Sequence, residues 1–336
     1  MAELPRLNGI IKALEEGHVA CVGAAPTDGL AGTSAPYDGA LFEMEHGPYD
    51  IRALQEGLSS RLDRRQIAQR GLAPAVTPIV RIPPNQGESN WVAKQVLDLG
   101  VYGIIWPHVD TVEDAYNAVA AMRYPRVAGR PLREPFGRRG DAPQRAVTYW
   151  GLTQQEYYAR AEVWPLHPQG ELLCGLMIES PESIGNLPKM LQEVPGIGVI
   201  FTGEGDLSQE LGYPRQYDHP EVLKGVRDIG AICKAHHVPN GWFHTTLDNV
   251  EQVIQEGYRV LMAPSARSYA VLHKGRSAAG RSAASAPAAV TADHQALLAD
   301  FCSLLSKGTD GPDVDPTAEP RATRHLRPRR RGGAEA

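Results

Sequence analysis

The fold is decided by residues 172–212, which read LLCGLMIESPESIGNLPKMLQEVPGIGVIFTGEGDLSQELG. Two apolar runs in this stretch, LLCGLMI and GVIFTG, have the composition of buried strands, and about a dozen residues of helical character separate them. This order predicts parallel neighbouring strands whose carboxyl ends meet at one side of a sheet. An acid follows each run, Glu179 after the first and Asp206 after the second. We therefore expect the two carboxylates at the same edge.

The same alternation continues on both sides of this stretch. Further strand-like runs lie at residues 18–25, 38–45, 75–83, 103–109, 240–245 and 259–265. Helical stretches lie at 50–71, 90–100, 111–125, 247–257 and 268–276, a short helix candidate follows the first strand-like run, and a helix also follows GVIFTG. The strand-like runs are continuously apolar, as strands covered on both faces should be. Eight strand–helix units predict an α/β fold, a TIM (β/α)8 barrel, in preference to an open doubly wound sheet. No GxGxxG motif follows the first strand, which argues against a dinucleotide-binding fold.

Three stretches fall outside this alternation. Residues 126–170 form a long insertion after the fourth unit, with a helical piece around 152–164, and we expect it to act as a lid or a subunit contact. Residues 275–291 are rich in Ala and Ser and lead into a last helix at 291–308, and the arginine-rich end lacks any apolar period. We therefore expect a barrel domain over 1–275, a linker and C-terminal helix over 276–307, and a disordered tail over 308–336.

Composition narrows the class of protein. A chain of 336 residues that is 42% hydrophobic can bury a full-sized core, and its net charge of −5 argues against nucleic acid or an anionic membrane as the main partner. The chain has no apolar run of the roughly 18 residues that a membrane span needs and no signal-peptide pattern at its start, so we expect a cytoplasmic protein. The four cysteines are widely spaced, which predicts reduced thiols.

Reactive groups in a TIM barrel gather at the carboxyl ends of the strands. The predicted strand ends carry four acids, one arginine and three histidines, namely Glu43, Glu45, Glu179, Asp206, Arg81, His46, His108 and His244. Two carboxylates on neighbouring strands suit a hard divalent cation, Mg²⁺ or Mn²⁺, with Co²⁺ or Zn²⁺ as alternatives. Such an ion keeps coordination positions open for a 2-oxo acid, and no nucleotide or organic cofactor is expected.

Other residues at these ends suit the same chemistry. Arg81 has the donors to hold a carboxylate or an enolate, and His46 is a candidate proton shuttle that Glu43 or Glu45 would orient. The backbone of Gly203, Glu204 and Gly205 is a candidate binding site for a substrate carboxylate.

Each of these assignments has a structural alternative. Glu179 has the position of a helix cap, Arg81 that of a salt-bridge residue and His46 that of an ordinary loop histidine. For His108 and His244, and for Tyr157 and Tyr158 in the insertion, a structural or packing role is the favoured interpretation.

Four segments, at residues 37–50, 77–85, 100–125 and 177–212, resemble the HpcH/HpaI aldolase/citrate lyase family. They include YDGALFEMEHGPYD, TPIVRIPPN and the stretch that ends in AMRYP. The resemblance implies a class II aldolase on a TIM barrel, which cleaves or forms a 4-hydroxy-2-oxo acid from pyruvate and an aldehyde through a metal-bound enolate. It also implies a homo-oligomer, a trimer of dimers in which a C-terminal helix is exchanged between protomers.

The resemblance assigns roles to particular positions. Glu179 and Asp206 match the metal ligands, Arg81 the arginine that binds substrate, and His46 the catalytic histidine. Glu43 falls where an orienting aspartate normally lies, and the backbone of residues 203–205 matches the part that binds the pyruvate carboxylate.

Four residues depart from the family's usual pattern. Glu43 is longer than aspartate, Met177 stands where a glutamine is frequent, Glu204 replaces a common proline, and His108 replaces an apolar or amide residue. Two other readings therefore stay open. One is an oxaloacetate-type decarboxylase or enolate-condensing enzyme similar to macrophomate synthase, and the other is a non-catalytic barrel that binds 2-oxo acids.

Overall fold

The computed structural model describes residues 4–25, 37–84, 90–125, 132–263 and 270–281. They belong to one compact unit, residues 1–286, and the other unit, residues 287–336, lies outside the described residues. The predicted C-terminal helix, its exchange between protomers, the disordered tail and the helix after the first strand all fall on residues that are not described. These expectations, like the domain limits, stay predictions.

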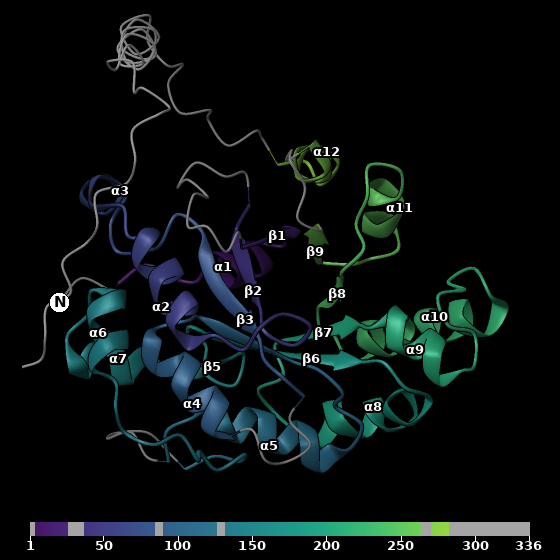
Figure 1. Cartoon of the computed structure of the whole chain (residues 1–336), viewed down its shortest axis with the longest axis horizontal. Helices are drawn as coiled ribbons and strands as arrows, with labels where there is room; N and C mark the ends of the chain where they lie inside the picture. Colours follow the sequence, from purple (N-terminus) through teal and green to yellow (C-terminus); the bar gives the residue numbers. More distant parts are fainter. Residues whose placement is uncertain (1–3, 26–36, 85–89, 126–131, 264–269, 282–336) are drawn as a thin grey trace, which may run out of the picture. The chain divides into compact units, whose positions relative to one another are not determined.

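Eight parallel strands close into a barrel within the described residues, which confirms the predicted TIM-barrel fold (Figure 1). The pairing of β4 with β6 closes the ring, and all neighbouring strands run parallel. The barrel strands are β1 (Ala20–Ala24), β2 (Gly39–Glu43), β3 (Thr77–Arg81), β4 (Gly103–Trp106), β6 (Leu172–Ile178), β7 (Val199–Thr202), β8 (Asn240–Trp242) and β9 (Val260–Ala263).

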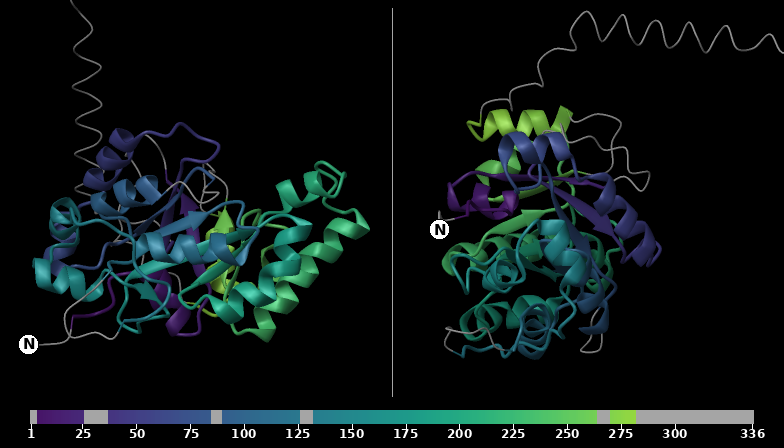
Figure 2. Two further views of the ribbon diagram at one scale, coloured as in Figure 1. Left: turned by 90° about the horizontal axis from the view of Figure 1, so that it is seen from below. Right: turned by 90° about the vertical axis from the view of Figure 1, so that its left-hand side faces the viewer.

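Helices surround these strands, as the two further views in Figure 2 show. They are α1 (Gly9–Glu15), α2 (Ile51–Ser60), α3 (Arg64–Arg70), α4 (Asn90–Leu99), α5 (Val112–Met122), α6 (Gln144–Trp150), α7 (Gln154–Arg160), α8 (Pro181–Glu193), α9 (Glu204–Glu210), α10 (Pro220–Ala235), α11 (Val250–Gln255) and α12 (Ala270–Ala278). The helix predicted over 50–71 is in fact two helices. Asp63 caps the second one by accepting hydrogen bonds from the backbone N–H groups of Arg65 and Gln66.

The strands are buried on both faces, which explains their continuous apolar sequences. The inward-facing side chains form a cluster that includes Leu41, Ile79, Phe201 and Met262, and a larger cluster fills the space between the strands and the helices. Apolar burial on both faces supplies most of the free energy that holds the barrel together.

Helix α1 covers the amino ends of the strands. Its residue Ile10 joins the inner cluster and lies so close to Gly39, the first residue of β2, that a Cβ there would be 2.4 Å from the Ile10 Cδ1 atom. The Asn8 side chain caps α1 and donates hydrogen bonds to the carbonyls of Tyr102 and Glu171, just before β4 and β6. The carboxyl ends of the strands lie at the opposite end of the barrel from α1.

The described part of the insertion packs on the outer wall of the barrel. Helix α6 lies against α4, and the short strand β5 (Val163–Trp164) pairs with the start of β6. The Trp150 ring stacks on Tyr102 at 4.2 Å, and its indole N–H donates to the Gly100 carbonyl. Tyr157 is fully buried, which confirms the packing role predicted for it. These contacts are with the wall of the barrel.

Three cysteines, Cys21, Cys174 and Cys233, are buried free thiols, as predicted, and Cys302 lies outside the described residues. Within the described ranges, no helix combines the length and the apolar character that crossing a bilayer requires.

Candidate active site

Glu43, Glu45 and Arg81 meet at the carboxyl ends of β2 and β3. The parallel register places Glu43 beside Arg81, and the Arg81 Nε donates to the Glu43 Oε2 at 2.7 Å. The Arg81 Nη1 lies 3.0 Å from the Glu45 Oε2, and the Glu45 side chain is only 4% exposed. Neither Glu45 carboxylate oxygen has a hydrogen-bond partner among the described residues. The arginine therefore neutralises part of a buried carboxylate whose hydrogen-bonding capacity is not used.

The His46 ring lies at the exposed edge of this group. Its side chain is 65% exposed, and its Nε2 lies 3.7 Å from the Glu45 Oε2. Glu43 accepts hydrogen bonds from the backbone N–H groups of Glu45 and His46 through its Oε1. Of the two predicted orienting acids, Glu43 therefore holds the turn and Glu45 faces the ring.

Glu179 follows β6 and is bound to His108, which follows β4. The backbone N–H of His108 donates to the Glu179 Oε1 at 2.6 Å, while the second oxygen, Oε2, has no hydrogen-bond partner among the described residues. His108 has a φ of 50°, a left-handed conformation that is uncommon for a residue with a side chain. A Cβ at Gly203 would lie 2.3 Å from the Glu179 Oε2, so this glycine leaves the room that the carboxylate occupies.

The residues that converge are Glu45, His108 and Glu179. One ligand atom from each lies within 4.8 Å of the other two, and among the described residues these three form a candidate metal-holding group. Two buried carboxylates with unpartnered oxygens beside an imidazole make a donor set that fits a divalent cation. From the sequence, Glu179 and Asp206 are the favoured metal ligands, and a structural role is favoured for His108.

Burial perturbs both acids of this group. It raises the pKa of Glu179 to about 7, the charges of Glu45 and Asp206 act in the same direction, and the N–H of His108 opposes them. Burial also raises the pKa of Glu45, against the lowering effect of Arg81. Two such carboxylates are costly to ionise side by side, so a cation between them would offset the cost.

Asp206 lies in the first turn of α9 and is partly exposed. It is near enough for its charge to raise the pKa of Glu179, but it is not one of the three residues of the converging group. The predicted pairing of Glu179 with Asp206 on one metal ion therefore stays a prediction, as does carboxylate binding by the backbone of residues 203–205.

The remaining predicted residues flank this group. His244 lies just past β8, and its Nδ1 is 2.5 Å from the Glu204 Oε1. Glu204, which stands where the family commonly has proline, therefore has a side-chain partner in this chain. The Met177 Sδ lies 3.6 Å from the Arg81 Nη1. Phe243 was not predicted from the sequence, and its ring lies 5.2 Å from the guanidinium of Arg81. Its position just past a strand end was the available signal.

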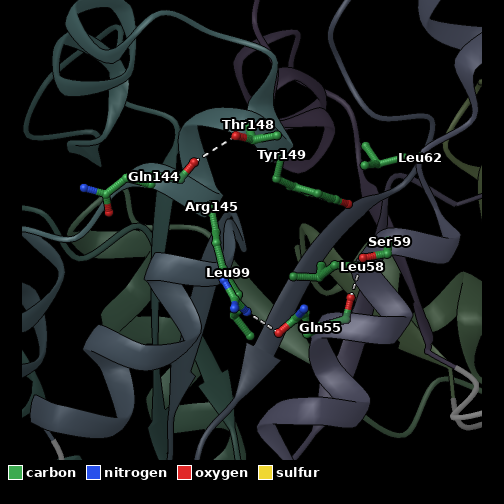
Figure 3. Close-up of a pocket in the computed structure, with 9 residues that line it drawn as sticks. All are labelled: Gln55, Leu58, Ser59, Leu62, Leu99, Gln144, Arg145, Thr148 and Tyr149. Atoms are coloured by element: carbon green, nitrogen blue, oxygen red, sulfur yellow. Dashed lines mark hydrogen bonds between the residues drawn. The ribbon is translucent and has the colours of Figure 1, made fainter.

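A cavity of about 480 Å³ lies away from this site, on the outer wall of the barrel (Figure 3). It is lined by residues of α2 and α6 and the end of α4, and Arg145 reaches across it to the Gln55 side chain. None of the predicted site residues lines it.

The chain belongs to the HpcH/HpaI aldolase/citrate lyase family, whose sequence profile matches residues 30–264. It is 32% identical over 213 residues to a 5-keto-4-deoxy-D-glucarate aldolase of Citrobacter koseri, covering 63% of this chain and 69% of the relative. It is 34% identical over 211 residues to a 2-keto-3-deoxy-L-rhamnonate aldolase of Klebsiella pneumoniae, covering 61% and 67%. These named relatives support an aldolase, and thus a lyase, as the class of this enzyme.

Solved structures agree on the fold. A family member from Burkholderia cenocepacia superposes with a TM-score of 0.63 at 22% identity, covering 89% of this chain and 98% of that one. Macrophomate synthase superposes with a TM-score of 0.56 at 20% identity, covering 90% and 91%.

Proposed function

We propose that this protein is a divalent-metal-dependent aldolase, which cleaves or forms a 4-hydroxy-2-oxo acid from pyruvate and an aldehyde. The observation that carries the proposal is the convergence of Glu45, His108 and Glu179 beside Arg81 at the carboxyl end of the barrel strands. The unpartnered oxygens of the buried acids suit a bound cation, and the neighbouring guanidinium suits the negative charge of a substrate.

The metal would be held by Glu179 and by Asp206, the second predicted ligand, and Glu45 and His108 of the converging group would lie beside the same ion. Mg²⁺ or Mn²⁺ suits these oxygen donors, with Co²⁺ or Zn²⁺ as alternatives. When bound, a divalent cation acts as a Lewis acid that draws electrons from the carbonyl of a 2-oxo acid.

The chain's own residues would act on the rest of the substrate. Arg81 is fixed by Glu43 and Glu45, so its remaining N–H bonds are held in place to stabilise the negative charge of an enolate. His46 is exposed and would remove the C4 hydroxyl proton, after which the C3–C4 bond breaks and its electrons form the enolate of pyruvate. Protonation of that enolate at C3 completes the cleavage.

The names of the relatives suggest the substrate class. One acts on a 2-keto-3-deoxy acid and another on a 5-keto-4-deoxy acid, so both names describe a ketone close to a carbon that carries no hydroxyl. We propose substrates of this type, keto-deoxy sugar acids, for this protein.

Deuterium exchange at C3 of pyruvate tests the enolate step directly, because it needs no knowledge of the aldehyde. We expect exchange in the presence of Mn²⁺ or Mg²⁺, its loss with EDTA and its return when metal is added back. Exchange that persists after complete removal of metal would refute the metal's role. Pyruvate and metal binding without exchange would favour a non-catalytic binding barrel.

A substrate panel separates the enzyme alternatives. Pyruvate release from 2-keto-3-deoxy acids, together with slow or absent turnover of oxaloacetate, supports the aldolase. Rapid oxaloacetate decarboxylation without cleavage of the keto-deoxy acids would favour the decarboxylase instead.

A further inference from the structure

His108 lies between two buried carboxylates, and each of its ring nitrogens faces one of them. The Nε2 lies 3.5 Å from the Glu45 Oε1, and the Nδ1 lies 3.7 Å from the Glu179 Oε1. The other Glu45 oxygen faces Arg81, so the oxygen directed at His108 is not the one that the guanidinium neutralises. The ring therefore completes a set of one nitrogen and two oxygen donors.

The spacing of these donors suits a shared ion. Ligands about 2.1 Å from a metal in octahedral geometry lie about 3 Å apart when adjacent and about 4 Å apart when opposite. The three candidate ligand atoms lie within 4.8 Å of one another, so small side-chain movements would bring them to these separations. The Glu45 and Glu179 side chains are 4% and 1% exposed, and Glu45 has no hydrogen-bond partner among the described residues.

The backbone holds His108 in this place. Its N–H donates to the same Glu179 oxygen that its ring approaches, and its left-handed φ of 50° turns the chain just past β4. The His108 side chain is 34% exposed, so one side of the group stays open to water and substrate, as catalytic metal sites require.

We infer that His108 supplies an imidazole nitrogen to a divalent cation shared with Glu45 and Glu179, so that the site prefers a first-row transition ion to Mg²⁺. This inference deepens the proposed function and rests on it for the presence of a metal. An imidazole ligand suits transition ions, whereas Mg²⁺ is bound mainly by carboxylates and water. The rival reading is that His108 is only an ion-pair partner of the two acids and lies outside the coordination sphere.

Pulsed electron paramagnetic resonance of the Mn²⁺-loaded protein distinguishes these readings without any measurement of activity. A directly bound imidazole couples its ¹⁴N nucleus to the Mn²⁺ electron spin, and labelling the histidines with ¹⁵N changes that coupling in the unmutated protein. We expect the coupling in the wild type and its loss in H108Q. We also expect H108Q to bind Mn²⁺ at least about tenfold more weakly, the lower end of the loss seen when metal sites are perturbed, with a smaller change for Mg²⁺.

H46Q and H244Q are the matched controls, because both histidines lie at the same end of the barrel and neither belongs to the converging group. Coupling that survives in H108Q and disappears in H46Q or H244Q would overturn the inference, as would Mn²⁺ bound without histidine coupling in the wild type. In either case, exchange that EDTA abolishes would leave the proposed function standing. A protein that binds no Mn²⁺ and shows no exchange would overturn both.

Discussion

Replacement of Glu179 by glutamine should make the metal-free protein more stable at alkaline pH. Burial raises the pKa of Glu179 from 4.5 to about 7, a difference of about 2.5 units, and each unit corresponds to about 1.4 kcal/mol. Because the pKa is higher in the folded state than in the unfolded state, the folded protein holds the Glu179 proton more tightly. The stability that this proton contributes is complete below pH 4.5 and is lost as the pH rises through 7. The ionised side chain therefore costs about 3 kcal/mol at pH 8, and Glu179→Gln removes that cost.

Urea unfolding of EDTA-treated protein at pH 4 and pH 8 measures this difference, at a fixed protein concentration. The free energy of unfolding of Glu179→Gln should match that of the wild type at pH 4 and exceed it by up to about 3 kcal/mol at pH 8. Glu182→Gln, an exposed acid in the first turn of α8, is the control and should shift stability by less than about 0.5 kcal/mol at either pH. Equal wild-type and Glu179→Gln stabilities at pH 8 would refute the reasoning that this carboxylate is destabilised by burial.

Three further substitutions test other parts of the account. Arg81→Ala should slow deuterium exchange at C3 of pyruvate by about 100-fold or more, as loss of an oxyanion donor does. Arg65 is exposed, and Arg65→Ala should leave the rate unchanged. Similar exchange rates in the two variants would show that Arg81 has no role in the enolate step. Gly39→Ala should destabilise the protein by about 1–3 kcal/mol in urea unfolding, because the new Cβ atom meets the Ile10 Cδ1 atom. Adding Ile10→Val should recover part of that loss, and additive losses in the double variant would contradict this contact. Trp150→Ala should cost about 3–5 kcal/mol of unfolding free energy by removing the stack on Tyr102, with exchange per folded molecule unchanged; a loss under about 1 kcal/mol would show that the insertion is not anchored there.

The barrel strands were predictable because each is buried on both faces and needs an uninterrupted apolar run. All eight predicted runs contain a strand of the barrel, from Ala20–Ala24 to Val260–Ala263. The break between α2 and α3 was missed because both helices carry polar, helix-favouring residues, although Asp63 is a good N-cap signal. Helix α6 was also missed, since its N-cap residue, Pro143, provides no side-chain hydrogen bond to the first turn.

The site was predictable in its location but less so in the grouping of its residues. Strand order is enough to place Glu43, Arg81 and Glu179 at one end of the barrel. The approach of Glu45 and His108 to Glu179 depends on the chain after the strands, including the left-handed turn at His108, which no periodic pattern records. The homo-oligomer implied by the family resemblance stays a prediction, and the C-terminal helix expected to be exchanged lies outside the described ranges.

The central claim is that Glu179 binds a divalent cation at the carboxyl end of the barrel strands, beside Arg81. Anomalous diffraction from a crystal soaked with Mn²⁺ and pyruvate measures this directly. We expect a single manganese peak within bonding distance of a Glu179 carboxylate oxygen, with pyruvate between the ion and the guanidinium of Arg81. A manganese peak bound elsewhere, or pyruvate bound in the barrel with no metal beside Glu179, would contradict it.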